Sequence, residues 1–236
     1  MKILTQASVK KVERKKNSVH VEIESNGKTK TEQFDTIISA VGIVGNIEGL
    51  GLENLSIKTD KSHIKTDNNC NVGIDGIFAI GDVAGAPWLA HKASHEGVMV
   101  AEIIAGEHTH PVDPSSIAGC TYCHPQIASV GLTEEEANKK GLKVKIGRFP
   151  FIGNGKAIAL GEQEGLIKTI FEAKTGELLG AHMVGAEVTE LIQGYVLGQK
   201  LETTEEDLIS TVFPHPTLSE MMHESVLDAF GRAIHI

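Results

Sequence analysis

The chain carries an imidazole and a carboxylate close together in the run Phe213-Pro-His-Pro-Thr-Leu-Ser-Glu220. Histidine changes charge near neutral pH, and a carboxylate on one ring nitrogen leaves the other nitrogen free to take a proton from a thiol or hydroxyl. His215 and Glu220 are therefore a candidate acid–base pair. The same spacing also fits a plain helix start, in which Thr217 is the N-cap and Glu220 closes a capping box.

A second candidate site follows the apolar run Gly76-Ile-Phe-Ala-Ile80, which predicts a short buried strand ending at Gly81-Asp82. A carboxylate at the carboxyl end of a parallel strand lies where open α/β sheets bind ligands, and it can accept hydrogen bonds from ligand hydroxyls. Gly81 would leave room for the ligand. The alternative is that Asp82 caps the helix that follows.

The cysteines favour no metal site. Cys120-Thr-Tyr-Cys123-His124 has the spacing that attaches a c-type haem, but nothing in the chain suggests the export that such a haem requires. A zinc site lacks a second pair of ligands. We expect Cys70, Cys120 and Cys123 to be ordinary thiols.

The elements that must position these residues change in character along the chain. Val19, Val21 and Ile23 alternate as in a sheet, and Asp35–Gly42 reads as an almost wholly buried strand. From about residue 114 the pattern predicts an α+β layout with strands near 121–131, 143–150, 165–172 and 178–184. Capping boxes at Thr133-Glu-Glu-Glu136 and Thr203-Thr-Glu-Glu206 open helices, and an apolar helical stripe contains Val188, Leu191, Ile192 and Tyr195.

Composition excludes some partners. The 236 residues carry a formal charge of −9, which argues against nucleic acid or an anionic membrane surface, because both are polyanions. No apolar run approaches the roughly 18 residues that span a bilayer. The N-terminal residues resemble neither a signal peptide nor a transit peptide, so we expect a bacterial cytoplasm or a mitochondrial matrix.

Several motifs resemble, in family order, those of the pyridine nucleotide–disulfide oxidoreductases. The C-terminal run with His215 is similar to the family's C-terminal signature, and Gly76–Val83 is similar to its second flavin motif. Leu89-Ala-His-Lys-Ala93 with Glu96-Gly97 resembles the dihydrolipoyl dehydrogenase branch. The remaining matches are Pro125–Thr133, Gly180-Ala-His-Met-Val-Gly185 and Glu190-Leu-Ile192.

The resemblance implies roles for particular residues. His215 and Glu220 would be the catalytic pair, which in the family reaches the disulfide and flavin of the opposite subunit of a homodimer. Gly42 would lie against NAD. The expected FAD-binding residues, with His91 positioning rather than accepting a proton, are Gly81, Asp82, Trp88, Leu89, Ala90 and His91.

The same resemblance covers only the C-terminal half of such an enzyme. Neither Gly-x-Gly-x-x-Gly fingerprint occurs, and the three cysteines lack the four-residue separation of the redox pair. Gly42-Ile-Val-Gly-Asn46 also lacks the arginine and proline of the family pattern. We therefore expect a fragment, or half of a split protein, that binds little or no FAD alone.

The expected fold class is α/β plus α+β, the C-terminal part of a flavoprotein with two dinucleotide-binding domains. Residues 1–43 would be the tail of the NAD-binding domain, 44–113 a piece of the FAD-binding domain and 114–236 the dimerisation domain, with a joint at Pro111–Ser116. The implied reaction is oxidation of protein-bound dihydrolipoamide, with electrons passing through a disulfide and FAD to NAD. The lipoyl domains would belong to 2-oxo acid dehydrogenase complexes or the glycine cleavage system. Two alternatives are a glutathione or mercuric reductase type of enzyme and a non-enzymatic, truncated dimerisation module.

Overall fold

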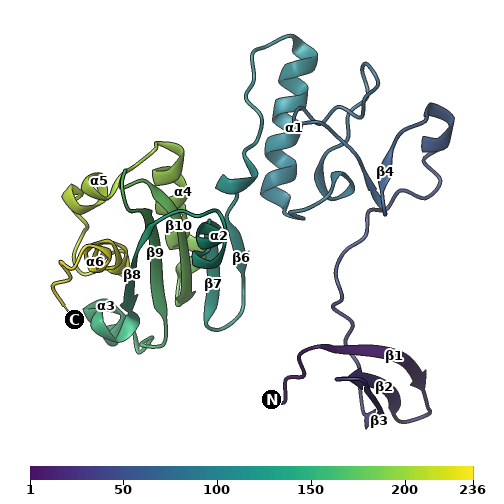
Figure 1. Ribbon diagram of the computed structural model, residues 1–236, viewed down its shortest axis with the longest axis horizontal. Helices are drawn as coiled ribbons and strands as arrows, with labels where there is room; N and C mark the ends of the chain where they lie inside the picture. The colour runs from purple at the N-terminus through teal and green to yellow at the C-terminus, as the bar shows by residue number, and fades with distance from the viewer. Residues whose placement is uncertain (236) are drawn as a thin grey trace. The chain divides into compact units, whose positions relative to one another are not determined.

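The computed structural model describes residues 1–235 and divides into two compact units, Met1–Val44 and Gly45–Ile236 (Figure 1). The first unit is an antiparallel sheet of β1 (Ala7–Arg14), β2 (Val19–Ser25) and β3 (Lys28–Phe34), with β2 in the centre. Val21 and Ile23 of β2 are buried, which confirms the predicted alternation. Asn26 and Gly27 turn the β2–β3 hairpin, and both have the positive φ that a two-residue turn requires.

The predicted buried strand over residues 35–42 is wrong. This segment has no regular secondary structure, and Ile38 and Val41 are 87% and 95% exposed. An apolar run becomes a strand only when its backbone groups can pair with a neighbour. Within the described part of the first unit, the sheet β1-β2-β3 offers these residues no partner strand.

The second unit begins with small elements that lead to a long helix. They are the 3₁₀ helix η1 (Leu52–Leu55), the hairpin β4 (Thr59–Asp60) and β5 (His63–Ile64), the 3₁₀ helix η2 (Gly81–Ala84) and α1 (Ala90–Ala105). The strand predicted at 76–80 is also wrong. Phe78 forms an isolated antiparallel bridge with Asn71, and Ala79 donates to the Cys70 carbonyl, so the run folds back on its own chain instead of joining a parallel sheet.

A five-stranded antiparallel sheet follows, in the order β6-β7-β10-β9-β8. Its strands are β6 (Gly119–Thr121), β7 (Gln126–Gly131), β8 (Val144–Pro150), β9 (Leu166–Glu172) and β10 (Leu178–Gly185). The predicted strands are confirmed, except that the one expected at 121–131 is two strands joined by a turn. The short 3₁₀ helices η3 (Pro114–Ser116) and η4 (Phe151–Gly153) precede β6 and follow β8.

The helices of this part are α2 (Glu134–Lys139), α3 (Gly155–Leu160), α4 (Val188–Lys200), α5 (Glu205–Ser210) and α6 (Glu220–Ala229). The capping box of Thr133 and Glu136 is confirmed. The second box lies one residue later than predicted, between Thr204 and Asp207. Thr203 does not serve as the cap, because its N–H donates to the Gly198 carbonyl of α4 and its carbonyl accepts from the Leu178 N–H of β10.

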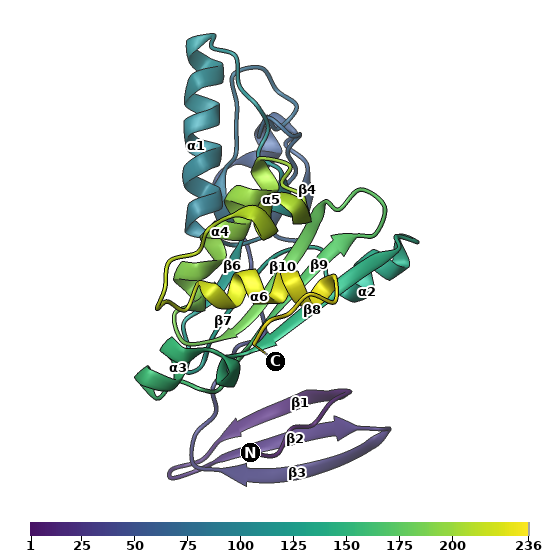
Figure 2. The ribbon, with the colours of Figure 1, turned by 90° about the vertical axis from the view of Figure 1, so that its left-hand side faces the viewer.

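The core lies between the sheet and two helices that cover one of its faces, α4 and α6 (Figure 2). Val188, Ile192 and Tyr195 of α4 are buried there, so the predicted apolar stripe is core. The Tyr195 hydroxyl donates to the Met222 carbonyl at 3.0 Å and joins α4 to α6. Burial raises the pKa of this phenol, as expected for a hydroxyl that stays protonated.

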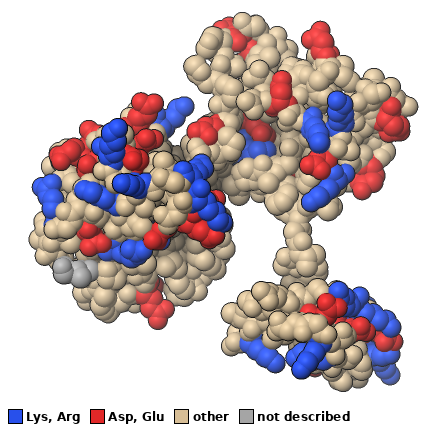
Figure 3. Space-filling model, in the orientation of Figure 1, with Lys and Arg blue, Asp and Glu red and all other residues tan. Residues whose placement is uncertain are grey.

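Charges of both signs are interspersed on the face shown in Figure 3, without a broad field of one sign. No helix within residues 1–235 is both long enough and apolar enough to cross a membrane.

Candidate active site

His215 lies in the segment between α5 and α6, directly before the helix that carries Glu220. Its Nδ1 is 2.9 Å from Glu220 Oε1. An ionised carboxylate can only accept hydrogen bonds, so this contact assigns the proton to Nδ1 and leaves Nε2 as the acceptor. The imidazole side chain is 77% exposed and that of Glu220 is 27% exposed. The structure therefore brings the two predicted catalytic residues together, with one ring nitrogen open to solvent.

The second carboxylate oxygen of Glu220 holds the loop. Oε2 accepts the Thr217 N–H at 2.9 Å, while the Thr217 hydroxyl donates to the Pro214 carbonyl at 2.7 Å. Thr217 is thus not the N-cap of the helix, because α6 begins at Glu220 after Ser219. Half of the expected capping box is present, and it shares its carboxylate with His215.

Asn154 anchors this loop from a distant part of the chain. Its side chain, which is 5% exposed, donates to the Thr217 carbonyl at 3.1 Å and accepts from the Ala157 N–H as the N-cap of α3. Asn-Gly after a strand signals a cap or a turn, but the sequence gives no hint of the contact with Thr217. This residue was missed by the sequence analysis.

The electrostatics of Glu220 suit a carboxylate that stays ionised. Burial raises its pKa, but the hydrogen bonds from Thr217 and His215 lower it by more, so the pKa lies below its usual value. An ionised carboxylate beside an imidazole orients the ring and stabilises the protonated form that appears when the ring takes a proton.

The second predicted site lies in the turn before α1. Gly81 and Asp82 open η2, with Gly81 at a φ of 70°, and an added Cβ there would lie 3.3 Å from Ala93 Cβ. The Asp82 side chain is exposed, and among residues 1–235 it makes no hydrogen bond or ion pair. Asp82 does not cap α1, since the N-cap position is Leu89.

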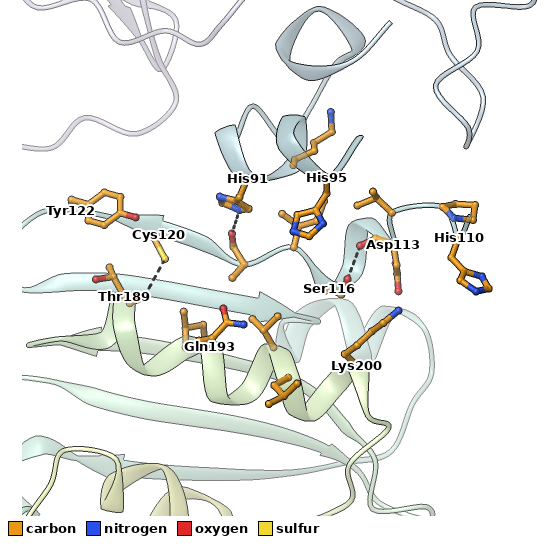
Figure 4. A pocket seen from close by; sticks show the side chains of 18 residues that line it. His91, His95, His110, Asp113, Ser116, Cys120, Tyr122, Thr189, Gln193 and Lys200 are labelled. Carbon is orange, nitrogen blue, oxygen red and sulfur yellow. Dashed lines mark hydrogen bonds between the residues drawn. The ribbon is translucent and has the colours of Figure 1, made fainter. Parts of the chain in front are cut away.

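The residues around the start of α1 have separate environments. Trp88 Nε1 donates to His63 Nε2 at 3.1 Å. Helix α1 begins at Ala90, and its N-cap residue Leu89 has no side chain that can accept a hydrogen bond. The first N–H groups of α1 therefore lack a side-chain cap. His91 Nε2 lies 2.9 Å from the Ala118 carbonyl, in the wall of a pocket that α4 also lines (Figure 4). No hydrogen bond or ion pair in the described residues joins this group to His215 and Glu220.

Gly42, the residue expected to lie against NAD, belongs to the first unit. Its φ of 109° favours glycine, but nothing lies within 4 Å of the position of an added Cβ. The positive φ of Gly42 is thus the reason for glycine at this position, and no close neighbour adds a second reason.

The cysteines are free thiols with different exposure. Cys70 is buried, Cys120 is half-buried and Cys123 is exposed. Burial raises the pKa of Cys70 to about 11, and burial also raises the pKa of Cys120. Within residues 1–235 no group of three His, Cys, Asp or Glu side chains is placed to hold a metal ion.

The family follows from two sequence comparisons. Residues 1–97 match the model of the pyridine nucleotide-disulphide oxidoreductases, and residues 117–226 match the model of their dimerisation domain. The chain belongs to the pyridine nucleotide-disulphide oxidoreductases. It is 57% identical to a dihydrolipoyl dehydrogenase of Rhizobium etli and 56% identical to one of Zymomonas mobilis, and both alignments cover all of this chain.

These relatives are longer than the chain. The alignments cover 49% and 51% of their sequences, so the chain spans about half the length of the curated relatives it matches. Among solved structures, LpdA of Mycobacterium tuberculosis aligns with a TM-score of 0.85 and 25% identity over 93% of this chain and 48% of its own. RclA of Escherichia coli, described as a flavoprotein disulfide reductase, shares the fold with a TM-score of 0.82. The expected fold class is therefore confirmed.

Two charged pairs near the predicted sites were missed. Glu224, one helical turn after Glu220, accepts hydrogen bonds from the Ile234 N–H and from His235 Nδ1. Lys92 and Glu96 form a buried ion pair beside η2. The i,i+4 spacing of the second pair is visible in the sequence, whereas the first pair depends on how the C-terminal segment folds back.

Proposed function

We propose that this chain is the part of a dihydrolipoyl dehydrogenase that supplies the acid–base pair, part of the FAD site and the dimer interface. The observation that carries the proposal is the contact of 2.9 Å between His215 Nδ1 and Glu220 Oε1, with the rest of the imidazole exposed. The names of the relatives at 56–57% identity favour this reaction over that of glutathione or mercuric reductases.

The chemistry of the pair follows from its geometry. A dithiol must lose a proton before it attacks a disulfide, because the thiolate is the nucleophile. His215 Nε2 would accept that proton while Glu220 keeps the ring oriented and offsets its positive charge. Glu220 in turn stays in place because its other oxygen accepts the Thr217 N–H.

The site needs a redox disulfide from elsewhere. Cys70, Cys120 and Cys123 are free, and none lies in the loop with His215. We infer that the pair acts on the disulfide of a second subunit in a homodimer, which the match to the dimerisation domain supports. The lipoyl domains of 2-oxo acid dehydrogenase complexes or of the glycine cleavage system would bring the substrate.

The cofactors of this reaction, FAD and NAD, carry the electrons when bound. Asp82 fits the ribityl hydroxyls of FAD, since its carboxylate is exposed and has no partner within residues 1–235. The uncapped start of α1, from Leu89 to His91, would face the electron-rich ring, and Trp88 would flank it. Gly42 would lie near NAD. The chain contains no glycine fingerprint for either pyrophosphate.

The domain assignment belongs to the same proposal. Residues 1–43 would close the NAD-binding domain, 44–113 would belong to the FAD-binding domain and 114–236 would form the dimerisation domain. The free thiols are compatible with a reducing compartment, either a bacterial cytoplasm or a mitochondrial matrix.

The first test is the intact mass of the protein in its source cells, captured with an antibody to the C-terminal segment. A mass about twice the 25.3 kDa of this chain is expected, since the relatives are about twice as long. A mass near 25.3 kDa, together with an absence of flavin and of dye reduction, would instead support a non-enzymatic dimerisation module.

The second test is His215→Gln in the protein as the cell makes it, assayed for NAD-dependent dihydrolipoamide oxidation. Glutamine keeps a polar side chain but cannot take a proton at neutral pH. We expect a loss of about 10²-fold or more. His108→Gln, at another exposed histidine, is the matched control and should keep full activity. Unimpaired oxidation by the His215 variant would refute the proposed role.

A further inference from the structure

A buried ion pair on α1 lies against the turn that carries Asp82. Lys92 Nζ is 2.9 Å from Glu96 Oε1, and the side chains are only 8% and 11% exposed. Removing two charges from water is costly, and well-packed apolar residues often stabilise such a position equally well. Stability alone therefore does not explain why this buried ion pair is present. Its other hydrogen bonds suggest a reason.

Those hydrogen bonds go to the two ends of the turn. Glu96 Oε2 accepts the Gly81 N–H at 2.8 Å, and Lys92 Nζ donates to the Gly85 carbonyl at 3.3 Å. Gly81 is the first residue of η2, and Gly85 is the residue that ends it. One ion pair thus makes hydrogen bonds to both ends of a single 3₁₀ turn.

The turn and the residue before it also pack closely against α1. An added Cβ on Gly81 would lie 3.3 Å from Ala93 Cβ, so glycine lets the turn approach the helix. Ile80 Cδ1 lies 3.5 Å from the Cβ position of Gly97. The residues that make these contacts all lie on one side of α1, the side that faces the turn.

The turn packs against β5 and has its own backbone hydrogen bonds, among them the one from the Gly85 N–H to the Asp82 carbonyl at 3.1 Å. Because an isolated 3₁₀ turn is too short to be stable, the hydrogen bonds from Lys92 and Glu96 add to what holds its shape. Asp82 lies between these two ends, its side chain is exposed, and it has no hydrogen-bond or ion-pair partner within residues 1–235. Asp82 is thus the one polar side chain of η2, and it remains free to meet a ligand.

We propose that Lys92 and Glu96 are positioning residues that clamp the Gly81–Gly85 turn and so present the Asp82 carboxylate to the hydroxyl groups of a bound polyhydroxyl chain. The pair is internally neutral, so it holds the turn without adding net charge beside Asp82. The identity of the ligand rests on the proposed function, in which Asp82 meets the ribityl chain of FAD. The clamp itself is a property of this chain and can be tested without any flavin.

The decisive measurement is hydrogen exchange of the Gly81 amide in the ¹⁵N-labelled chain. Glu96→Leu removes the acceptor, and we expect exchange at Gly81 to accelerate about tenfold or more, as for loss of a hydrogen bond to a charged group. Glu96→Gln keeps an acceptor oxygen and should restore most of the protection. Glu102→Leu, at an exposed position of the same helix, is the matched control and should exchange like the parent.

A lone Lys92 left in the interior could unfold the region, so Lys92→Met combined with Glu96→Leu removes both charges together. This double variant should stay folded, keep the protection of the β9 and β10 amides, and still lose protection at Gly81. Unchanged Gly81 exchange in the double variant would overturn the clamp. Equal loss of protection in β9 and β10 would overturn it as well, because it would mean a general effect on stability.

A second measurement tests the role of the ligand separately from the clamp. It is the amount of FAD that the protein, as the cell makes it, retains. The double variant and Asp82→Ala should both retain less FAD than the parent after gel filtration. If Gly81 exchange responds as expected while Asp82→Ala retains FAD fully, the clamp stands and the proposed flavin role of Asp82 is refuted.

Discussion

Substitution of Gly147 by alanine should loosen the helix that carries Glu220. Gly147 is a buried residue of β8, and an added Cβ would lie 1.7 Å from the Ser225 carbonyl oxygen and 2.9 Å from the Ala229 nitrogen. Both atoms belong to the backbone of α6, so no side-chain rotation can relieve the clash. An ordinary contact begins at 3.4 Å, so α6 must withdraw by about 1.7 Å or more.

The cost has two parts. Forcing extra volume into a packed core costs roughly 1–3 kcal/mol, and a rigid backbone obstacle places this site at the upper end. The withdrawal also stretches the bonds from Thr169 Oγ1 to the Ser225 carbonyl and hydroxyl, now 3.1 and 2.9 Å, each worth about 1 kcal/mol. We expect a loss of about 3 kcal/mol or more, equivalent to a Tm lower by roughly 6–12 °C for a unit of this size.

Thermal unfolding followed by far-UV circular dichroism measures this shift. Gly155→Ala is the matched control, because Gly155 opens α3 and nothing lies within 4 Å of its Cβ position. That variant should unfold at the parent temperature or slightly above it, by the gain of up to about 1 kcal/mol that alanine brings to a helix. A Gly147→Ala midpoint within about 2 °C of the parent would refute the packing of α6 on β8.

Three further predictions concern the same unit. Burial raises the pKa of Glu224, but bonds from Ile234 and His235 lower it by more, so its folded pKa lies below its usual value of 4.5. The stability that Glu224 contributes is present above pH 4.5 and is lost as the pH falls through the lower folded pKa. The Ile234 amide should therefore lose protection from hydrogen exchange in acid. Glu224→Gln should abolish that dependence on pH. Alkylation followed by mass spectrometry should modify exposed Cys123 first, half-buried Cys120 next and buried Cys70 only after unfolding; early modification of Cys70 would contradict its position. Thr169→Val should cost about 1–3 kcal/mol in urea unfolding, because the buried Ser225 carbonyl loses its side-chain partner; an unchanged midpoint would exclude that role.

The α+β part was predictable because its signals are local and agree with one another. The strands expected at 143–150, 165–172 and 178–184, the Thr133–Glu136 box and the α4 stripe each appear in the structure where the sequence placed them or within a few residues. In each case the residues that specify the element are also the residues that bury its apolar face or satisfy its end.

The two strands predicted at 35–42 and 76–80 failed for a common reason. Both are apolar runs that read as buried strands, and the second was expected to be parallel. A strand of this kind depends on neighbours that lie far away in the sequence. Phe78 forms an isolated bridge with Asn71, and Val41 remains exposed. Apolar composition indicates that a segment can be buried, but it does not supply the partner.

The sequence by itself determined the chemistry that is available: the residue types at His215, Glu220 and Asp82, the family to which they belong, and the absence of a redox cysteine pair and glycine fingerprints. Only the tertiary structure decided how these groups are held. Asn154 anchors the His215 loop, and α6 packs against Gly147; both contacts join positions far apart in the chain. The hydrogen bonds from Lys92 and Glu96 to the turn with Asp82 depend on how that turn folds onto α1. Such contacts follow from three-dimensional packing of backbone carbonyls and amides, which every residue type carries alike, so no residue pattern announces them.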